Sequence, residues 1–187
     1  VYEKDLLEYK EGITYIKVTD THEVVGYIAS AFYDHPSRKL KLIGVTGTNG
    51  KTTIATLLHK LFRGLGYNAG MMGTVVNKIN DLEMEAERTT SDSITLNATL
   101  ARMVEDGCQY CFIEVSSHAV ALKRILGLQF AGGIFTNLTQ DHLDFHQTIE
   151  NYRDAKKKFF DMLPTESFAL SNLDDANGEY MLADTNA

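Results

Sequence analysis

The segment from Gly44 to Thr53, GVTGTNGKTT, has the residue types that bind a phosphate chain. Closely spaced glycines let the backbone turn tightly and aim its N–H groups at phosphate oxygens. Lys51, after the last glycine, can reach the β- and γ-phosphates, and the Thr52 hydroxyl can hold Mg²⁺. Val45 stands where the common motif has its first glycine, so the loop is a variant. An ordinary glycine turn is the alternative, but the Lys-Thr-Thr after an apolar run favours a nucleotide site.

A second polar group follows the apolar run Tyr110-Cys-Phe-Ile and begins with Glu114. A carboxylate that ends a buried strand is costly without a partner, and Mg²⁺ is a natural one because it prefers oxygen ligands. Capping of the next helix, or pairing with a base, is the alternative. Ser116, Ser117 and His118 could be mistaken for a nucleophile and its base. Neighbours on a strand–helix turn rarely face each other, however, and no G-x-S-x-G elbow is present.

A third group follows the apolar run 132–135, and it contains Asn137, Asp141, His142, Asp144 and His146. The two histidines are four residues apart, which suits a metal site. Zinc usually needs a third protein ligand and a helical frame, and no cysteine is nearby in the sequence, so zinc is disfavoured.

Two further patterns need a choice between a structural and a chemical role. Lys156, Lys157 and Lys158 are consecutive, and three solvated helix lysines are the plain interpretation of such a run. Cys108 and Cys111 form a C-x-x-C pair that enters an apolar strand. A redox or zinc role would need a second pair or a thioredoxin-like frame, so we expect both cysteines in the core.

The elements that must position these groups are short apolar strands alternating with amphipathic helices. The expected strands are 10–18, 40–46, 69–75, 79–87, 110–116, 132–137 and 167–172. The expected helices are 21–34, 51–65, 92–107, 117–125, 148–163 and the tail. Asp20 should cap the first of them, with Glu23 at the reciprocal position of a capping box. This alternation predicts an α/β fold with a mostly parallel sheet flanked by helices, and ligands beyond the carboxyl ends of the strands.

Composition narrows the class of protein. The 187 residues suit one main domain, and 44% hydrophobic with 23% charged residues is typical of globular proteins. Eighteen Lys and Arg against 25 Asp and Glu leave a net charge of −7, which argues against nucleic-acid polymers and anionic membranes as partners. No apolar run reaches the about 18–20 residues of a membrane span, and no signal peptide is visible. We expect a cytoplasmic protein.

The segment GTNGKTT resembles the ATP loop of the Mur ligase family, which also includes the folylpolyglutamate synthases. These P-loop NTPase-like enzymes form amides and split ATP to ADP and phosphate. Further resemblance lies in EVSSHAVALKR (114–124), TTSD (89–92), TNLTQDHLDFH (136–146) and NYRDAKKKFF (151–160). Val120, Ser91 and Phe145 stand where the family commonly has leucine, proline and tyrosine.

The resemblance implies a role for each matching position. ATP would be bound by Gly47, Thr48, Asn49, Gly50, Lys51, Thr52, Thr53 and Asn137. Two Mg²⁺ ions would be held by Thr52, Glu114, His142 and Lys156, the last carbamylated by CO₂. Lys51, His142 and Lys156 would be catalytic. Thr89, Thr90, Ser117 and Arg124 would contact the substrate. Carbamylation needs a neutral amine and hence a lysine with a lowered pKa, but spacing alone does not select Lys156 from its neighbours.

The implied activity is ATP-dependent amide formation in peptidoglycan precursor synthesis. A diamino acid, meso-diaminopimelate or L-lysine, would be joined to UDP-MurNAc-L-Ala-D-Glu through an acyl phosphate. Residues 1–39 would end an N-terminal substrate domain, and residues 40–187 would form the ATP-binding central domain of a monomer. The amino-acid-binding C-terminal domain would be absent, so we expect little activity from this piece. The alternatives are another ligase of the family, such as a folylpolyglutamate synthase, or a non-catalytic nucleotide-binding module.

Overall fold

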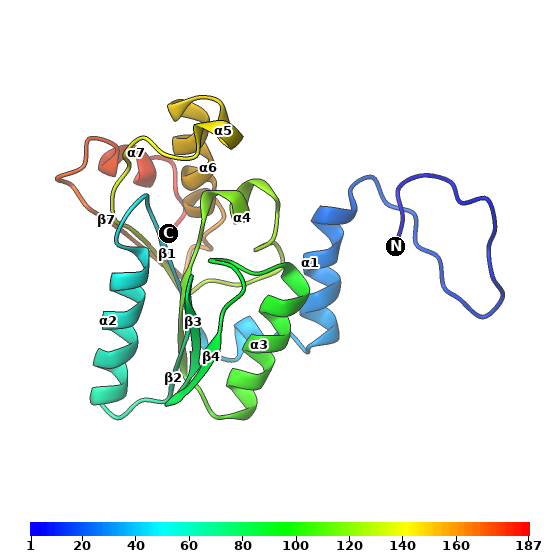
Figure 1. The fold of residues 1–187 in the computed structure, drawn as a ribbon, viewed down its shortest axis with the longest axis horizontal. Helices are drawn as coiled ribbons and strands as arrows, with labels where there is room; N and C mark the ends of the chain where they lie inside the picture. Colours follow the sequence, from blue (N-terminus) through cyan, green and yellow to red (C-terminus); the bar gives the residue numbers. More distant parts are fainter.

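The computed structural model describes residues 1–187 and contains one seven-stranded sheet with the strand order β4-β3-β2-β5-β1-β6-β7 (Figure 1). The strands are β1 (Lys41–Thr46), β2 (Ala69–Met72), β3 (Val76–Ile79), β4 (Leu82–Glu85), β5 (Tyr110–Glu114), β6 (Gly132–Phe135) and β7 (Phe168–Ser171). Five of them, β2, β5, β1, β6 and β7, run parallel, and β3 and β4 add an antiparallel edge. The predicted mostly parallel α/β sheet is confirmed.

Strand β1 lies at the centre of the sheet and pairs with β5 on one side and β6 on the other. All of it after Lys41 is buried. Gly44 belongs to this core and not to the phosphate loop, because a Cβ there would lie 2.4 Å from the ring of Phe159. The absence of a side chain lets helix α6 (Ile149–Asp161) pack closely on the strand that carries the loop.

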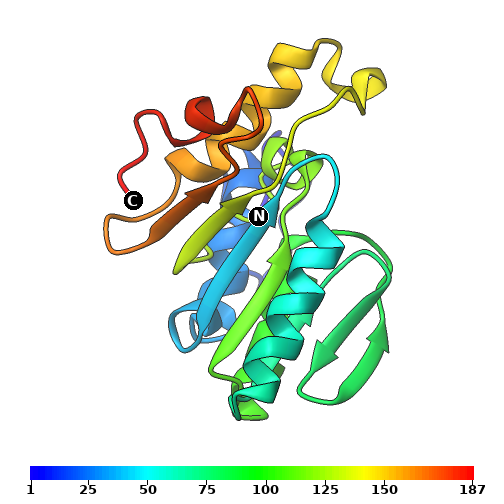
Figure 2. The ribbon, with the colours of Figure 1, turned by 90° about the vertical axis from the view of Figure 1, so that its left-hand side faces the viewer.

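Helices cover both faces of the sheet (Figure 2). Helix α2 (Lys51–Gly64) packs on one face through a core that includes Ile43, Val45, Ala55 and Phe112. Helices α3 (Ser93–Glu105) and α6 pack on the other, over a larger core around Leu42, Leu100, Phe130 and Phe159. Two-sided cover explains why the central strands are continuous apolar runs instead of alternating ones.

Helix α1 (Thr21–Phe32) begins as predicted, because the Asp20 side chain accepts a hydrogen bond from the Glu23 amide. The reciprocal half of the capping box is not formed, since the Glu23 carboxylate bonds to Lys123 instead. The helix packs against α3, outside the sheet (Figure 1). Its buried face is narrow: Gly26, Ala29 and Ser30 are buried, while Phe32 is 79% exposed.

The strand predicted for residues 10–18 is not formed, and the segment makes only an isolated bridge between Tyr2 and Lys17. Its apolar residues Ile13 and Ile16 stay about half exposed, at 55% and 49%. A strand needs a neighbour to satisfy its backbone groups. This segment pairs with none of the seven strands of the sheet.

Two other segments differ from the prediction. The single strand expected over 79–87 is a hairpin, in which Asn80 turns the chain with φ 54° between β3 and β4. Helix α5 (Leu143–His146) was not predicted, and α4 (Ser117–Ala121) is shorter than the expected 117–125. The predicted helical tail is confirmed by α7 (Gly178–Leu182), and a 3₁₀ turn, η1 (Pro36–Arg38), follows α1. The structure contains no helix with the length and apolar character to cross a membrane.

Candidate nucleotide and magnesium site

The phosphate loop lies between the end of β1 and the start of α2, at the carboxyl edge of the sheet between β5 and β6. Gly47 has φ 146°, and a Cβ there would lie 2.0 Å from the Thr136 hydroxyl. Gly50 has φ 85° and is the N-cap residue of α2. Both positions therefore require glycine, one for space and conformation and the other for conformation.

No side chain caps the start of α2, although Asp20, Asp92 and Thr148 cap the three other helices of twelve or more residues. The first-turn amides of α2 are consequently left for another acceptor. An anion at this position would be stabilised by these N–H groups and by the helix dipole. Thr52 and Thr53, in this first turn, are exposed.

The loop is held from β6 by Asn137 and its neighbour Thr136. The Asn49 amide donates to Asn137 Oδ1 at 3.0 Å, and Asn137 Nδ2 donates back to the Asn49 carbonyl at 3.1 Å. The Thr48 amide donates to the Asn137 carbonyl at 2.8 Å, and the Thr136 hydroxyl to the Asn49 carbonyl at 2.6 Å. Asn137, which the resemblance assigns to ATP binding, therefore holds the loop in shape, a role that was not predicted.

Lys51 folds back over its own loop. Its ammonium donates to the carbonyls of Gly47 and Thr48 at 2.9 and 2.8 Å. Burial lowers its pKa, while the carboxylates of Glu114 and Asp141 act in the opposite direction. These two carboxylates are thus the acidic neighbours of the Lys51 ammonium.

Lys156 is the buried lysine of its helix, with 1% of its surface exposed. Its Nζ donates to the Gly47 carbonyl at 2.9 Å and lies 4.4 Å from the centre of the Tyr152 ring. Burial, followed by the nearby Lys51 charge, lowers its pKa to about 7. Lys157 instead pairs with Asp161, and Lys158 is exposed. The structure therefore distinguishes Lys156 where the sequence spacing did not, and it supplies the lowered pKa that carbamylation needs.

Glu114 ends β5 with no exposed surface. Its two carboxylate oxygens accept hydrogen bonds from the Thr74 amide at 2.9 Å and the Thr74 hydroxyl at 3.0 Å. Gly73 leaves room for this arrangement, because a Cβ there would lie 2.6 Å from Glu114 Oε1. Each oxygen keeps a lone pair for a cation. Thr74 was not predicted, and its only signal in the sequence is its position just after an apolar strand.

The predicted substrate residues lie beside Glu114 and differ in exposure. The Thr90 hydroxyl is buried and donates to the Glu114 carbonyl at 2.8 Å, and Arg124 donates to the Thr90 carbonyl at 3.1 Å. Ser117 is 1% exposed, and its Oγ lies 2.9 Å from His146 Nε2. Thr89 is half-buried. Thr90 and Ser117 are therefore buried supports of the edge of the site, while Thr89 and Arg124 are accessible to a ligand.

His142 is the N-cap residue of α5, with φ 52°, and its Nε2 lies 3.5 Å from the Asp141 carboxylate. Its ring lies 4.8 Å from that of His118, edge to face. No three His, Cys, Asp or Glu side chains are grouped to hold a metal ion. That pattern excludes an all-protein cage but suits Mg²⁺, which is usually bound by one or two carboxylates, phosphate oxygens and water. The donor set of Glu114 and the Thr52 hydroxyl fits such an ion.

A cavity of about 470 Å³ opens directly beside the phosphate loop. It is lined by Gly50, Thr53, Ile54, Ile134, Phe135, Thr136, Asn137, Leu170, Ser171 and Asn172. An apolar wall with a few polar groups at its rim suits a flat heterocycle. Ser171 and Asn172 were not predicted. Their signal was their place at the end of β7, the edge where ligands of such sheets bind.

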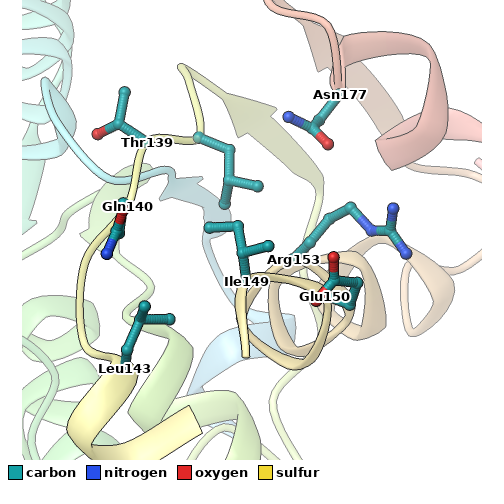
Figure 3. Close-up of a pocket in the computed structure, with 8 residues that line it drawn as sticks. Thr139, Gln140, Leu143, Ile149, Glu150, Arg153 and Asn177 are labelled. Atoms are coloured by element: carbon teal, nitrogen blue, oxygen red, sulfur yellow. The ribbon is translucent and has the colours of Figure 1, made fainter. Parts of the chain in front are cut away.

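A second cavity, of about 410 Å³, lies between the loop that follows β6, helix α6 and the residue before α7. Figure 3 shows Thr139 and Gln140 at one side of it and Arg153 and Asn177 at the other. Leu138, Leu143, Ile149 and Glu150 complete the lining, and none of the predicted site residues takes part.

A glycine-rich loop before an uncapped helix, a buried carboxylate at the neighbouring strand end and a buried lysine bonded to the loop define a nucleotide-binding α/β protein of the P-loop type. Residues 45–187 match the Mur ligase middle domain, and the chain belongs to this family. The two cysteines are buried and unpaired, in agreement with the expected core role.

Relatives agree with this assignment. The UDP-N-acetylmuramoyl-L-alanyl-D-glutamate–2,6-diaminopimelate ligase of Bacteroides fragilis is 60% identical over 178 residues, which are 95% of this chain and 37% of that protein. The ligase with the same name from Cytophaga hutchinsonii is 57% identical, over 97% of this chain and 37% of its own length. The chain thus spans about a third of the curated relatives that it matches.

Solved structures show the same fold. A structure of a ligase with that name matches with a TM-score of 0.77 and 28% identity, over 94% of this chain and 36% of the other. The folylpolyglutamate synthase of Mycobacterium tuberculosis, complexed with ADP and AMPPCP, matches with a TM-score of 0.66 and 14% identity, over 87% of this chain and 44% of the other.

Proposed function

We propose that the chain is the ATP-binding part of a ligase that joins diaminopimelate to UDP-MurNAc-L-Ala-D-Glu. The observation that carries this is the convergence of Lys51, Glu114 and Lys156 on the loop before the uncapped α2. The names of the relatives at 60% and 57% identity support the substrate and favour diaminopimelate over L-lysine. ATP would place its phosphates on the α2 amides and its base in the cavity beside the loop.

In the proposed reaction the protein mainly stabilises charge on the phosphates and forms no covalent bond with the substrates. The D-glutamate carboxylate attacks the γ-phosphorus of ATP, and the bond from that phosphorus to the β–γ bridging oxygen breaks. The products of this step are ADP and an acyl phosphate on the D-glutamate. The diaminopimelate amine then attacks the acyl carbon and releases phosphate. Lys51 moves from the loop carbonyls onto the β- and γ-phosphate oxygens, where it offsets the charge that develops on them.

Two Mg²⁺ ions would supply further neutralisation of phosphate charge at this site. We propose Thr52, Glu114 and His142 as their protein ligands. Glu114 is already oriented by Thr74, so it needs little rearrangement to bind a cation.

Lys156 is proposed to be carbamylated. Its neutral amine attacks the carbon of CO₂, an N–C bond forms, one proton goes to solvent, and the side chain becomes an anion. The pKa of about 7 supports this, because a large share of the amine is neutral near physiological pH. The anionic product would sit beside Lys51 and offer an oxygen ligand to the second ion.

Thr89 and Arg124 are proposed to contact the UDP-muramoyl-dipeptide directly, with Thr90 and Ser117 holding the edge on which it lies. Residues 1–39 are proposed to be the end of a substrate-binding domain, and residues 40–187 the central domain. We further propose that the complete protein is a monomer, acts in the cytoplasm, and contains a separate domain for the incoming amino acid. Closure of that domain would exclude water from the acyl phosphate.

The test is phosphate release from ATP by the complete protein that carries this chain. UDP-MurNAc-L-Ala-D-Glu is supplied with meso-diaminopimelate or with L-lysine in separate runs. Release that needs the UDP-dipeptide and diaminopimelate together is the expected result. Release with folate and glutamate instead would assign another ligase of the family. Nucleotide binding without release under any condition would assign a binding module.

A further inference from the structure

We infer that His146 is a positioning residue whose hydrogen bond to Ser117 fixes α5 on the start of α4, and so fixes the position of His142 relative to the end of β5 that carries Glu114. The inference rests on the proposed function, because it gives His142 and Glu114 a shared magnesium site.

Helix α5 is short and is held by a few side-chain contacts, among them the rings of His142 and His146 against Tyr152 of α6 at 5.9 and 5.2 Å between centroids. It contains four residues, and both flanking residues are left-handed, with φ 52° at His142 and 69° at Gln147. Left-handed non-glycine residues persist only where their surroundings impose them. His146 is the one buried side chain of α5, with 7% of its surface exposed. Its carbonyl also accepts a bond from Asn151 at the start of α6, at 2.9 Å.

Ser117, the hydrogen-bond partner of His146, lies close in the sequence to Glu114, the candidate metal ligand on β5. Ser117 is the first residue of α4, three positions after Glu114, and its Oγ lies 2.9 Å from His146 Nε2. In Figure 1, α5 lies at the top of the molecule, with α4 below it at the carboxyl edge of the sheet. One hydrogen bond therefore joins the short segment that carries His142 to the segment that carries Glu114.

Ring contacts reinforce this bond. The His118 ring stacks on Phe145 with centroids 4.2 Å apart and an interplanar angle of 35°. The same ring meets His142 at 4.8 Å and His146 at 5.4 Å, both edge to face. His118 follows Ser117 directly, so α4 contacts α5 through two neighbouring side chains, Ser117 by the hydrogen bond and His118 by its ring. With these contacts in place, the His142 ring has a defined position relative to β5.

The consequence is an effect on metal affinity. Loss of a group that orients a metal ligand typically weakens binding by about 10–100-fold. We therefore expect His146→Phe, which keeps a buried ring but has no nitrogen, to weaken Mn²⁺ binding about tenfold. Mn²⁺ is the probe, and its free concentration is measured by electron paramagnetic resonance in the complete protein. His146→Gln retains a polar atom near Ser117 and should restore most of the affinity.

A variant of Ser117, the hydrogen-bond partner of His146, and a matched control variant complete the experiment. Ser117→Ala should weaken Mn²⁺ binding as much as His146→Phe, and the double variant should be no weaker, because both changes remove one bond. His59 is also a buried histidine, 5% exposed, with Nε2 3.1 Å from the Ala69 carbonyl, and it belongs to α2, which covers the opposite face of the sheet. His59→Phe should lower the thermal midpoint without changing Mn²⁺ affinity.

A folded His146→Phe protein with wild-type Mn²⁺ affinity would overturn the inference, and so would losses that multiply in the double variant. Glu114→Gln separates this outcome from failure of the proposed function. If Glu114→Gln leaves Mn²⁺ binding intact, the metal site itself is wrong. If Glu114→Gln abolishes binding and His146→Phe does not weaken it, only the positioning role is wrong.

Discussion

The Lys156 ammonium donates a hydrogen bond to the carbonyl of Gly47 at 2.9 Å, across 109 positions of the sequence. The bond joins a helix on one face of the sheet to the glycine at which the phosphate loop begins. Gly47 also receives the Lys51 ammonium at 2.9 Å, so one carbonyl holds both cations of the site. Any change in the charge of Lys156 therefore alters the electrostatic environment of the Gly47 carbonyl and of Lys51.

Carbamylation of Lys156 should rise with pH. The pKa of about 7 means that the neutral, reactive amine is scarce at pH 6 and predominant at pH 8. At a fixed concentration of dissolved CO₂, the carbamate signal from ¹³CO₂ in nuclear magnetic resonance should grow over this interval. Lys156→Arg should remove the signal and Lys157→Arg should keep it. A signal that survives Lys156→Arg would place the modification elsewhere.

Lys156→Met should stabilise the protein, most of all in acid. The pKa of Lys156 is lowered from 10.5 to about 7, so between these values the unfolded chain binds more protons and wild-type stability rises with pH. Below pH 7 the folded state carries the full cost of the buried charge. In CO₂-free buffer, the gain in the free energy of unfolding should be about 3 kcal/mol larger at pH 6 than at pH 9.

Denaturant titrations of wild type and variant at both pH values measure this difference. The exposed Lys158 is the control, and Lys158→Met should show the same small effect at both pH values. An equal gain from Lys156→Met at pH 6 and pH 9 would mean that the buried amine is not the source.

Gly47→Ala should damage nucleotide binding. The new Cβ would meet the Thr136 hydroxyl at 2.0 Å in a backbone conformation that only glycine adopts freely. The loop must shift, and we expect ADP affinity to fall about tenfold or more by calorimetry. Gly64→Ala is the matched control, because nothing lies within 4 Å of its Cβ. It should leave ADP affinity unchanged and add up to about 1 kcal/mol of stability.

Cys108 and Cys111 should be unreactive in the folded protein. Both are buried, and burial raises the pKa of each thiol. A disulfide reagent such as DTNB should titrate neither thiol before denaturant is added and both afterwards. Replacement of both cysteines by serine should lower stability and leave ADP affinity unchanged. Loss of ADP binding in a folded double variant would argue for a role in the site.

The sequence predicts the central part of the fold well, because its signals there are local. The apolar runs of β1, β5 and β6 and the glycines after β1 each specify their own segment. Tertiary context decided the rest. The alternating residues 10–18 found no strand to pair with, and Asn80 converted one expected strand into a hairpin.

In the site, too, some features are predictable from the sequence and others depend on tertiary context. The residue types of the phosphate loop, Glu114 and Lys156 are visible in the sequence, whereas their roles depend on burial. Lys156 differs from Lys157 only through its position under the loop, and Ser117 proved to be buried against a histidine 29 residues away. Asn172 reaches the cavity only because β7 lies next to β6.

The central place of β1 also determines when the site comes into being. Its partners, β5 and β6, begin 69 and 91 residues after β1 does, and the lysine bonded to its loop comes later still. Contacts of such long range form late in folding and during synthesis. A nascent chain on the ribosome thus carries the complete glycine-rich sequence long before it can bind nucleotide. A bound nucleotide consequently stabilises only complete, folded molecules against unfolding, and incomplete chains are not stabilised by it.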